Sequence, residues 1–134
     1  DADIYSNPNN PIIGTRAFGT TPESASVGAI SYLAGLRDGG IIGCAKHFPG
    51  HGDTSTDSHL ELPVLHLTKE ELQARELLPF QALIGAEVPM VMTAHILFPK
   101  IDANVPATLS KTILTGILRE ELGFKGVIVS DDLD

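Results

Sequence analysis

The chain has 134 residues, of which 43% are hydrophobic, and its formal net charge is −8. This is enough apolar material for the core of one globular domain, and too little charge to keep the chain unfolded. The nine lysines and arginines are scattered, which excludes a basic surface for nucleic acid, and no apolar run approaches the about 20 residues of a membrane-spanning helix.

The single cysteine, Cys44, stands in the apolar run GIIGCA and excludes a disulfide within the chain. We expect this thiol to be buried and unreactive. The chain opens on Asp1 rather than Met and has no signal-peptide pattern there, so the sequence leaves the compartment open between cytoplasm and secretion.

The first predicted element is a helix that follows Thr21. Thr21, Pro22 and Glu23 have the pattern of an N-cap and a first helical turn, and Gly39 should end the helix. Apolar residues at helical spacing form one stripe along it: Val27, Ile30, Leu33 and Ala34. The apolar run at 41–46 is typical of a buried strand in a parallel sheet.

Two more helix–strand pairs follow. Thr68 and Glu71 form a capping box, which predicts a helix to about Ala86 that Pro79 would kink or divide. A buried strand is predicted at 89–95. Ser110 then caps a third helix, which ends at Gly123 before the apolar run 126–132. The apolar face of this helix is predicted to comprise Ile113, Leu114, Ile117 and Leu118.

Helices that alternate with apolar strands predict an α/β fold with a parallel sheet, either an open doubly wound sheet or a (β/α)8 barrel. The barrel is favoured because polar groups follow each predicted strand: Lys46 and His47, Thr93 and His95, and Ser130, Asp131 and Asp132. No glycine-rich phosphate turn is present. Residues 1–134 would then form part of a (β/α)8 barrel, about three consecutive helix–strand units of one domain.

The stretch 46–59, KHFPGHGDTSTDSH, concentrates titratable side chains between glycines and prolines and must be a loop. Several of these side chains could bind a metal: His47, His51, Asp53, Asp57 and His59. However, the prolines and glycines break the helix on which zinc histidines usually stand one turn apart.

Acid–base chemistry is the alternative that we favour for this stretch. Asp57 is two residues before His59, so a turn can bring its carboxylate to the imidazole and raise the basicity of the ring. Asp131, at the end of the third strand, is the best-placed nucleophile, although an aspartate there could also cap a helix. We expect His51 and Asp53 to hold the loop together, and His95 either to line the pocket or to be packed and hydrogen-bonded.

Three motifs in order, IGTRAFG, KHFPGHGDTSTDSH followed by LP, and GFKGVIVSDDL, resemble glycoside hydrolase family 3. Within the family they are most similar to the bacterial β-N-acetylglucosaminidases of the NagZ type. The resemblance implies a (β/α)8 barrel that hydrolyses terminal β-linked N-acetylglucosamine with retention of configuration. By motif position it implies Asp131 as the nucleophile, His59 as the general acid/base and Asp57 as its supporting carboxylate.

The same resemblance implies that Arg16, Lys46 and His47 bind the sugar, with no metal and no cofactor. The expected partner is a carbohydrate that contains N-acetylglucosamine, either a glycan or a muropeptide, and not nucleic acid. A β-glucosidase, an N-acetylglucosaminide phosphorylase, an inactive carbohydrate-binding piece and a metal-dependent hydrolase stay open as alternatives. Residues 1–134 in isolation are expected to be inactive.

Overall fold

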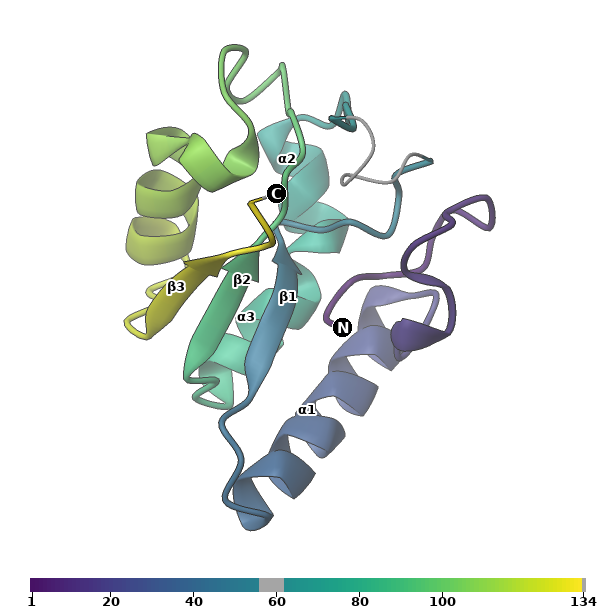
Figure 1. Cartoon of the computed structure of the whole chain (residues 1–134), viewed down its shortest axis with the longest axis vertical. Coiled ribbons are helices and arrows are strands. Elements are labelled where there is room, and N and C mark those ends of the chain that lie inside the picture. Colours follow the sequence, from purple (N-terminus) through teal and green to yellow (C-terminus); the bar gives the residue numbers. More distant parts are fainter. Residues whose placement is uncertain (56–61, 134) are drawn as a thin grey trace.

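The computed structural model describes residues 1–55 and 62–133 of the chain (Figure 1). Its elements, in chain order, are η1 (Gly14–Arg16), α1 (Pro22–Asp38), β1 (Cys44–Phe48), α2 (Lys69–Glu71), η2 (Leu72–Glu76), α3 (Leu78–Gly85), β2 (Met90–Thr93), η3 (Ala107–Leu109), η4 (Thr112–Glu121) and β3 (Val127–Ser130). Within the described part, no helix combines the length and apolarity needed to cross a bilayer.

The three strands form one parallel sheet in the order β1-β2-β3, which confirms the predicted α/β class. Met90 of β2 is paired with Cys44 of β1 on one side and with Val127 of β3 on the other. The arrowheads in Figure 1 therefore end at one edge of the sheet, with α3 behind it. Because every connection passes through a helix, the side chains that follow the strands gather at this edge.

Helix α1 begins as predicted, because the Thr21 hydroxyl accepts a hydrogen bond from the backbone N–H of Ser24 at 3.3 Å. The helix is followed by Gly40 in the left-handed region, at φ +71°. The predicted apolar stripe is wrong as a buried face, since Val27 is 67% exposed. Instead, the helix buries the small side chains of Ala25 and Ala29 together with Leu33.

Strand β1 begins three residues later than predicted. Ile41 and Ile42 are 60% and 70% exposed, because the Ile41 N–H still donates to Leu36 O and closes the end of α1. The strand runs on through Lys46 and His47, so these two residues lie in β1 and not after it. Phe48 ends the strand fully buried, with its ring edge-on to that of Phe80 at 5.2 Å between centroids.

The predicted division of the second helix at Pro79 is confirmed. The capping box at Thr68 and Glu71 begins α2, and η2 then widens to i→i+5 bonds such as Leu77 N–H to Leu72 O at 2.9 Å. Pro79 lies in the first turn of α3, where its missing N–H costs no helical hydrogen bond.

The third helix also starts and stops where the sequence predicts. The Ser110 hydroxyl accepts from the Ile113 N–H at 3.1 Å, and Gly123 ends the helical run with φ +70°. Ile113, Ile117 and Leu118 are buried on the predicted face. This face packs into the one hydrophobic core that the described part of the chain forms with the sheet and α3.

Candidate active site

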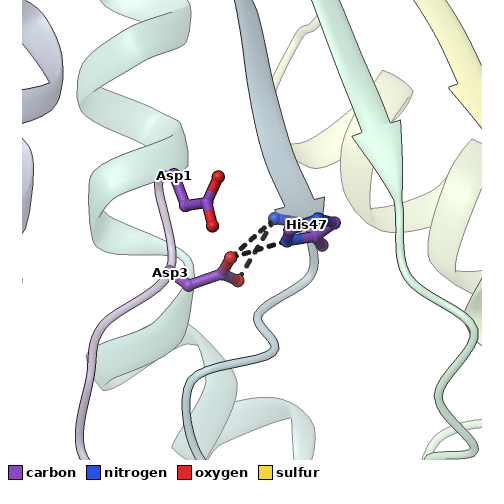
Figure 2. A group of neighbouring side chains, drawn as sticks. All are labelled: Asp1, Asp3 and His47. Carbon is purple, nitrogen blue, oxygen red and sulfur yellow. Dashed lines mark hydrogen bonds and ion pairs between the residues drawn. The ribbon is translucent and has the colours of Figure 1, made fainter. Parts of the chain in front are cut away.

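His47 is held at the end of β1 by the buried carboxylate of Asp3 (Figure 2). Nδ1 of the ring lies 2.8 Å from Oδ2 of Asp3, and the His47 backbone N–H reaches both carboxylate oxygens at 3.1 Å. The backbone N–H of His51 donates to Oδ1 at 2.6 Å. Burial by itself would raise the pKa of Asp3, but the bonds from His47 and His51 lower it below its usual range. The Asp3 carboxylate is therefore ionised, and it accepts hydrogen bonds from the two backbone N–H groups and from the His47 ring.

Asp131 lies at the end of β3, on the other side of the His47 ring. Its Oδ2 is 3.6 Å from Nε2 of His47, its Oδ1 accepts from the Asp132 backbone N–H at 2.9 Å, and its side chain is 19% exposed. The carboxylate is thus oriented by the protein and still accessible. The structure brings together two residues that the sequence pointed to separately, His47 and Asp131.

His95, after β2, supports the segment that bears Asp131. Its Nε2 lies 2.6 Å from the carbonyl oxygen of Asp132, and its Nδ1 lies 2.8 Å from the Thr108 hydroxyl. A carbonyl only accepts, so Nε2 carries a proton here. Of the two expectations for His95, the hydrogen-bonded one is confirmed.

Arg16 and Lys46 line a cavity of about 430 Å³ between α1 and β1, together with Asp1. The Arg16 side chain is 45% exposed, and its Nε lies 3.3 Å from Oδ2 of Asp1. The remaining wall is mostly apolar and includes Cys44. Cys44 is half-buried and not fully buried as expected, and burial raises the pKa of its thiol, which agrees with the expected low reactivity. The structure thus places Arg16 and Lys46 beside one cavity.

The loop after β1 is fastened to the N-terminal segment. Asn10 donates from Nδ2 to the His51 carbonyl at 2.8 Å, and His51 Nδ1 lies 2.6 Å from the Thr54 hydroxyl. Gly52 packs so closely that a Cβ there would lie 1.7 Å from the carbonyl oxygen of Ile4. Burial lowers the pKa of the His51 imidazole. The structural role expected for His51 is therefore borne out.

A second buried carboxylate, Glu76, underlies the same loop. Its side chain is 1% exposed, its Oε1 accepts from Nε of Arg75 at 2.5 Å, and its Oε2 has no hydrogen-bond partner. Arg75 also pairs with Asp53 of the loop at 2.8 Å. Burial raises the pKa of Glu76 to about 7, against the lowering effect of Arg75. Asp53 thus holds the loop to η2, as expected for a structural residue.

Within the described residues, Asp1, Asp3 and His47 place three potential metal ligand atoms within 4.8 Å of one another. Arg16 already pairs with Asp1, and Nδ1 of His47 is already bonded to Asp3. A cation would have to compete with a guanidinium and break the imidazole–carboxylate bond. The carboxylate of Asp1 and Nδ1 of His47 thus already have partners within the chain.

Asp57 and His59 lie outside the described residues, so their predicted roles stay predictions. Asp3 and Glu76 are the site residues that sequence reasoning missed. Asp3 stands in the short run DADI, where a carboxylate between apolar residues was the available signal. Nothing in the sequence near Glu76 indicates that its carboxylate is buried.

The comparisons with known proteins identify the family of the chain. Residues 2–134 match the model of the glycosyl hydrolase family 3 N-terminal domain, and the chain belongs to this family. It is 48% identical over 122 residues to the β-hexosaminidase of Methylococcus capsulatus. That match covers 91% of this chain and 36% of the relative.

Solved structures give the same result. A family 3 β-N-acetylglucosaminidase from Paenibacillus sp. superposes with a TM-score of 0.95 at 46% identity, covering 98% of this chain and 25% of that one. NagZ from Neisseria gonorrhoeae in complex with N-trifluoroacetyl-D-glucosamine superposes with a TM-score of 0.91 at 42% identity. This match covers 98% of this chain and 38% of NagZ. The chain therefore spans about a quarter to two fifths of the length of these relatives.

Proposed function

We propose that the chain is part of the catalytic domain of a retaining β-N-acetylglucosaminidase, which hydrolyses terminal β-linked N-acetylglucosamine. The observation that carries this proposal is the accessible Asp131 carboxylate beside His47 at the edge where the parallel strands end. The β-hexosaminidase relatives and the glucosamine derivative bound to NagZ of N. gonorrhoeae support the substrate class.

We propose further that the parent domain is a (β/α)8 barrel. Sequence-consecutive neighbours in a parallel sheet are the order that a barrel uses, whereas a doubly wound sheet reverses its order at a switch point. The Ala2 N–H also donates to Lys46 O at 2.7 Å, so the residues before β1 already run along its free edge.

The first chemical step assigned to this site is attack by the Asp131 carboxylate on the anomeric carbon. The glycosidic C–O bond breaks, and His59, supported by Asp57, donates its proton to the leaving oxygen. In the second step His59 takes a proton from water, whose oxygen attacks the same carbon and releases the sugar and the Asp131 carboxylate. Two inversions give retention of configuration.

Arg16, Lys46 and His47 are assigned to sugar binding. All three lie on or beside β1 and the N-terminal segment. Arg16 and Lys46 can donate to a hydroxyl or acetamido oxygen, and Nε2 of His47 can accept from a hydroxyl. Lys46 and Arg16 line the cavity on one side of β1, and His47 faces Asp131. This arrangement supports binding of a sugar from the Lys46 side with its anomeric carbon toward Asp131.

The proposal is tested on the full-length protein with aryl glycosides. We expect release of p-nitrophenol from the N-acetylglucosaminide, and a loss of at least about 10³-fold for Asp131→Ala because covalent catalysis is lost. His59→Ala should slow substrates with poor leaving groups far more than activated aryl ones, because only the former need a proton donor. Equal losses for both classes would contradict the role of His59.

The same assay separates the alternatives. Faster turnover of the p-nitrophenyl glucoside would indicate a β-glucosidase, and acceleration by phosphate with release of a sugar 1-phosphate would indicate a phosphorylase. NagZ of N. gonorrhoeae has also been solved with a zinc ion, so loss of activity in EDTA, restored by zinc, would favour a metal-dependent hydrolase. Residues 1–134 alone should be inactive, and turnover by them would contradict the need for the rest of the barrel.

A further inference from the structure

Asp3 is a fully buried carboxylate to which the proposed reaction assigns no part. Its side chain is 0% exposed, and three donors surround it: the backbone N–H groups of His47 and His51, and Nδ1 of His47. A buried charge is tolerated only where such donors replace water. The two backbone N–H groups could donate to any acceptor. The bond to Nδ1 of His47 also determines which nitrogen of the imidazole carries a proton.

The bond between Asp3 and His47 fixes which ring nitrogen carries a proton. An ionised carboxylate only accepts, so Nδ1 of His47 must be the donor. The ring is then held with Nε2 on the opposite side, 3.6 Å from Oδ2 of Asp131. The His47 side chain is 5% exposed, and the His51 ring packs edge-on to it at 5.7 Å between centroids, so the ring has little freedom to turn.

We propose that Asp3 is a positioning residue, which acts through His47 and holds the Nε2 side of the imidazole toward the carboxylate of Asp131. This inference rests on the proposed function, in which Asp131 is the nucleophile. If Asp3 were merely structural, it would stabilise the backbone at His47 and His51 and its effect would not depend on the imidazole. The two roles therefore differ in one measurable respect, their dependence on the His47 side chain.

The variant Asp3→Asn separates the backbone bonds from the imidazole bond. Its amide oxygen can accept the backbone N–H of His51, which lies 2.6 Å from Oδ1 of Asp3. The amide NH₂ would then point at Nδ1 of His47 and donate to it, so the ring would carry its proton on Nε2 instead. We expect kcat for p-nitrophenyl N-acetylglucosaminide to fall about 10²- to 10⁴-fold, as when a catalytic imidazole is held in the wrong tautomer.

A double-mutant cycle then tests whether the loss passes through His47. In a His47→Gln background, Asp3→Asn should change kcat by less than about twofold, because the ring that it positions is gone. A loss of the same size in both backgrounds would overturn the proposal. Asp102→Asn is the matched control, since Asp102 accepts from the Ser110 hydroxyl at 2.8 Å and from the Asn104 backbone N–H at 3.4 Å, neither of which is an imidazole. Its kcat should stay within about twofold of the wild type.

NMR of ¹⁵N-histidine-labelled protein gives a readout that does not depend on activity. The wild-type His47 ring should show a proton on Nδ1, and Asp3→Asn should remove it. If no aryl glycoside is hydrolysed, the proposed function fails, whereas the spectrum still decides the Asp3–His47 contact. If Asp3→Asn does not fold, the wild-type spectrum still tests the proton on Nδ1 of His47 that the proposal requires. A His47 ring with a bare Nδ1 in the wild type would overturn the inference.

Discussion

Replacing Glu76 with glutamine should stabilise the protein above neutral pH and have little effect in acid. The charged groups that act on this carboxyl are Arg75, which lowers its pKa, and Asp53 and Asp3, which raise it together with burial. The result is a pKa of about 7 in place of the ordinary value of 4.5. The carboxyl is thus easier to ionise in the unfolded chain than in the folded protein.

The sign of the effect follows from this difference. Below about pH 4.5 the Glu76 carboxyl is protonated in both the folded and the unfolded chain, so it does not lower the free energy of unfolding. As the pH rises toward about 7, the carboxyl ionises in the unfolded chain first, and the free energy of unfolding falls. A difference of about 2.5 pKa units at 1.36 kcal/mol each corresponds to about 3 kcal/mol lost above neutral pH. Glutamine has nearly the same shape and no charge to bury, so it should recover this amount.

Urea unfolding of wild type and Glu76→Gln at about pH 5 and about pH 8 measures the difference directly. We expect Glu76→Gln to be more stable by about 3 kcal/mol at the higher pH and by less than about 1 kcal/mol at the lower. Glu121→Gln is the control, because its partly exposed pair with Lys69 should contribute less than about 1 kcal/mol at either pH. Equal destabilisation by Glu76→Gln at both pH values would refute the raised pKa of Glu76.

Three further changes test the packing around the site. Gly52→Ala should destabilise the protein by about 1–3 kcal/mol in urea unfolding, because the new Cβ would lie 1.7 Å from the carbonyl oxygen of Ile4. Gly116→Ala, with no neighbouring atom within 4 Å of the added carbon, should instead stabilise η4 by about 0.5–1 kcal/mol, and equal outcomes would contradict the close contact at Gly52. Ser110→Ala should lower the unfolding free energy by about 1 kcal/mol through loss of the helix cap, and an unchanged melting temperature would show that the Ile113 N–H finds another partner.

Helix boundaries were predictable because their signals are local. The hydroxyl and carboxylate of the capping box at Thr68 and Glu71 stand three residues apart and satisfy each other's backbone groups without help from the rest of the chain. Strand β1 lacked such a signal. The apolar run at 41–46 has no alternation that marks its start, and the chain uses Ile41 to close α1 before β1 begins.

The site was predictable in part for the same reason. His47 and Asp131 each stand in a recognisable motif at a strand end, and a parallel sheet brings strand ends together. Asp3 and Glu76 acquire their character only from tertiary contacts. The charge of Asp3 is stabilised by donors more than forty positions away, and the carboxyl of Glu76 is buried by the loop that packs over it.

The His47 ring is contacted by two carboxylates that are far apart in the sequence, Asp3 before β1 and Asp131 after β3. A polypeptide that emerges from the ribosome can join Asp3 to His47 once β1 is made, but Asp131 arrives only after β2 and β3 have been added in order. Contacts over such long separations close slowly. Asp131 would therefore meet the His47 ring only after the contact between Asp3 and His47 can already have formed.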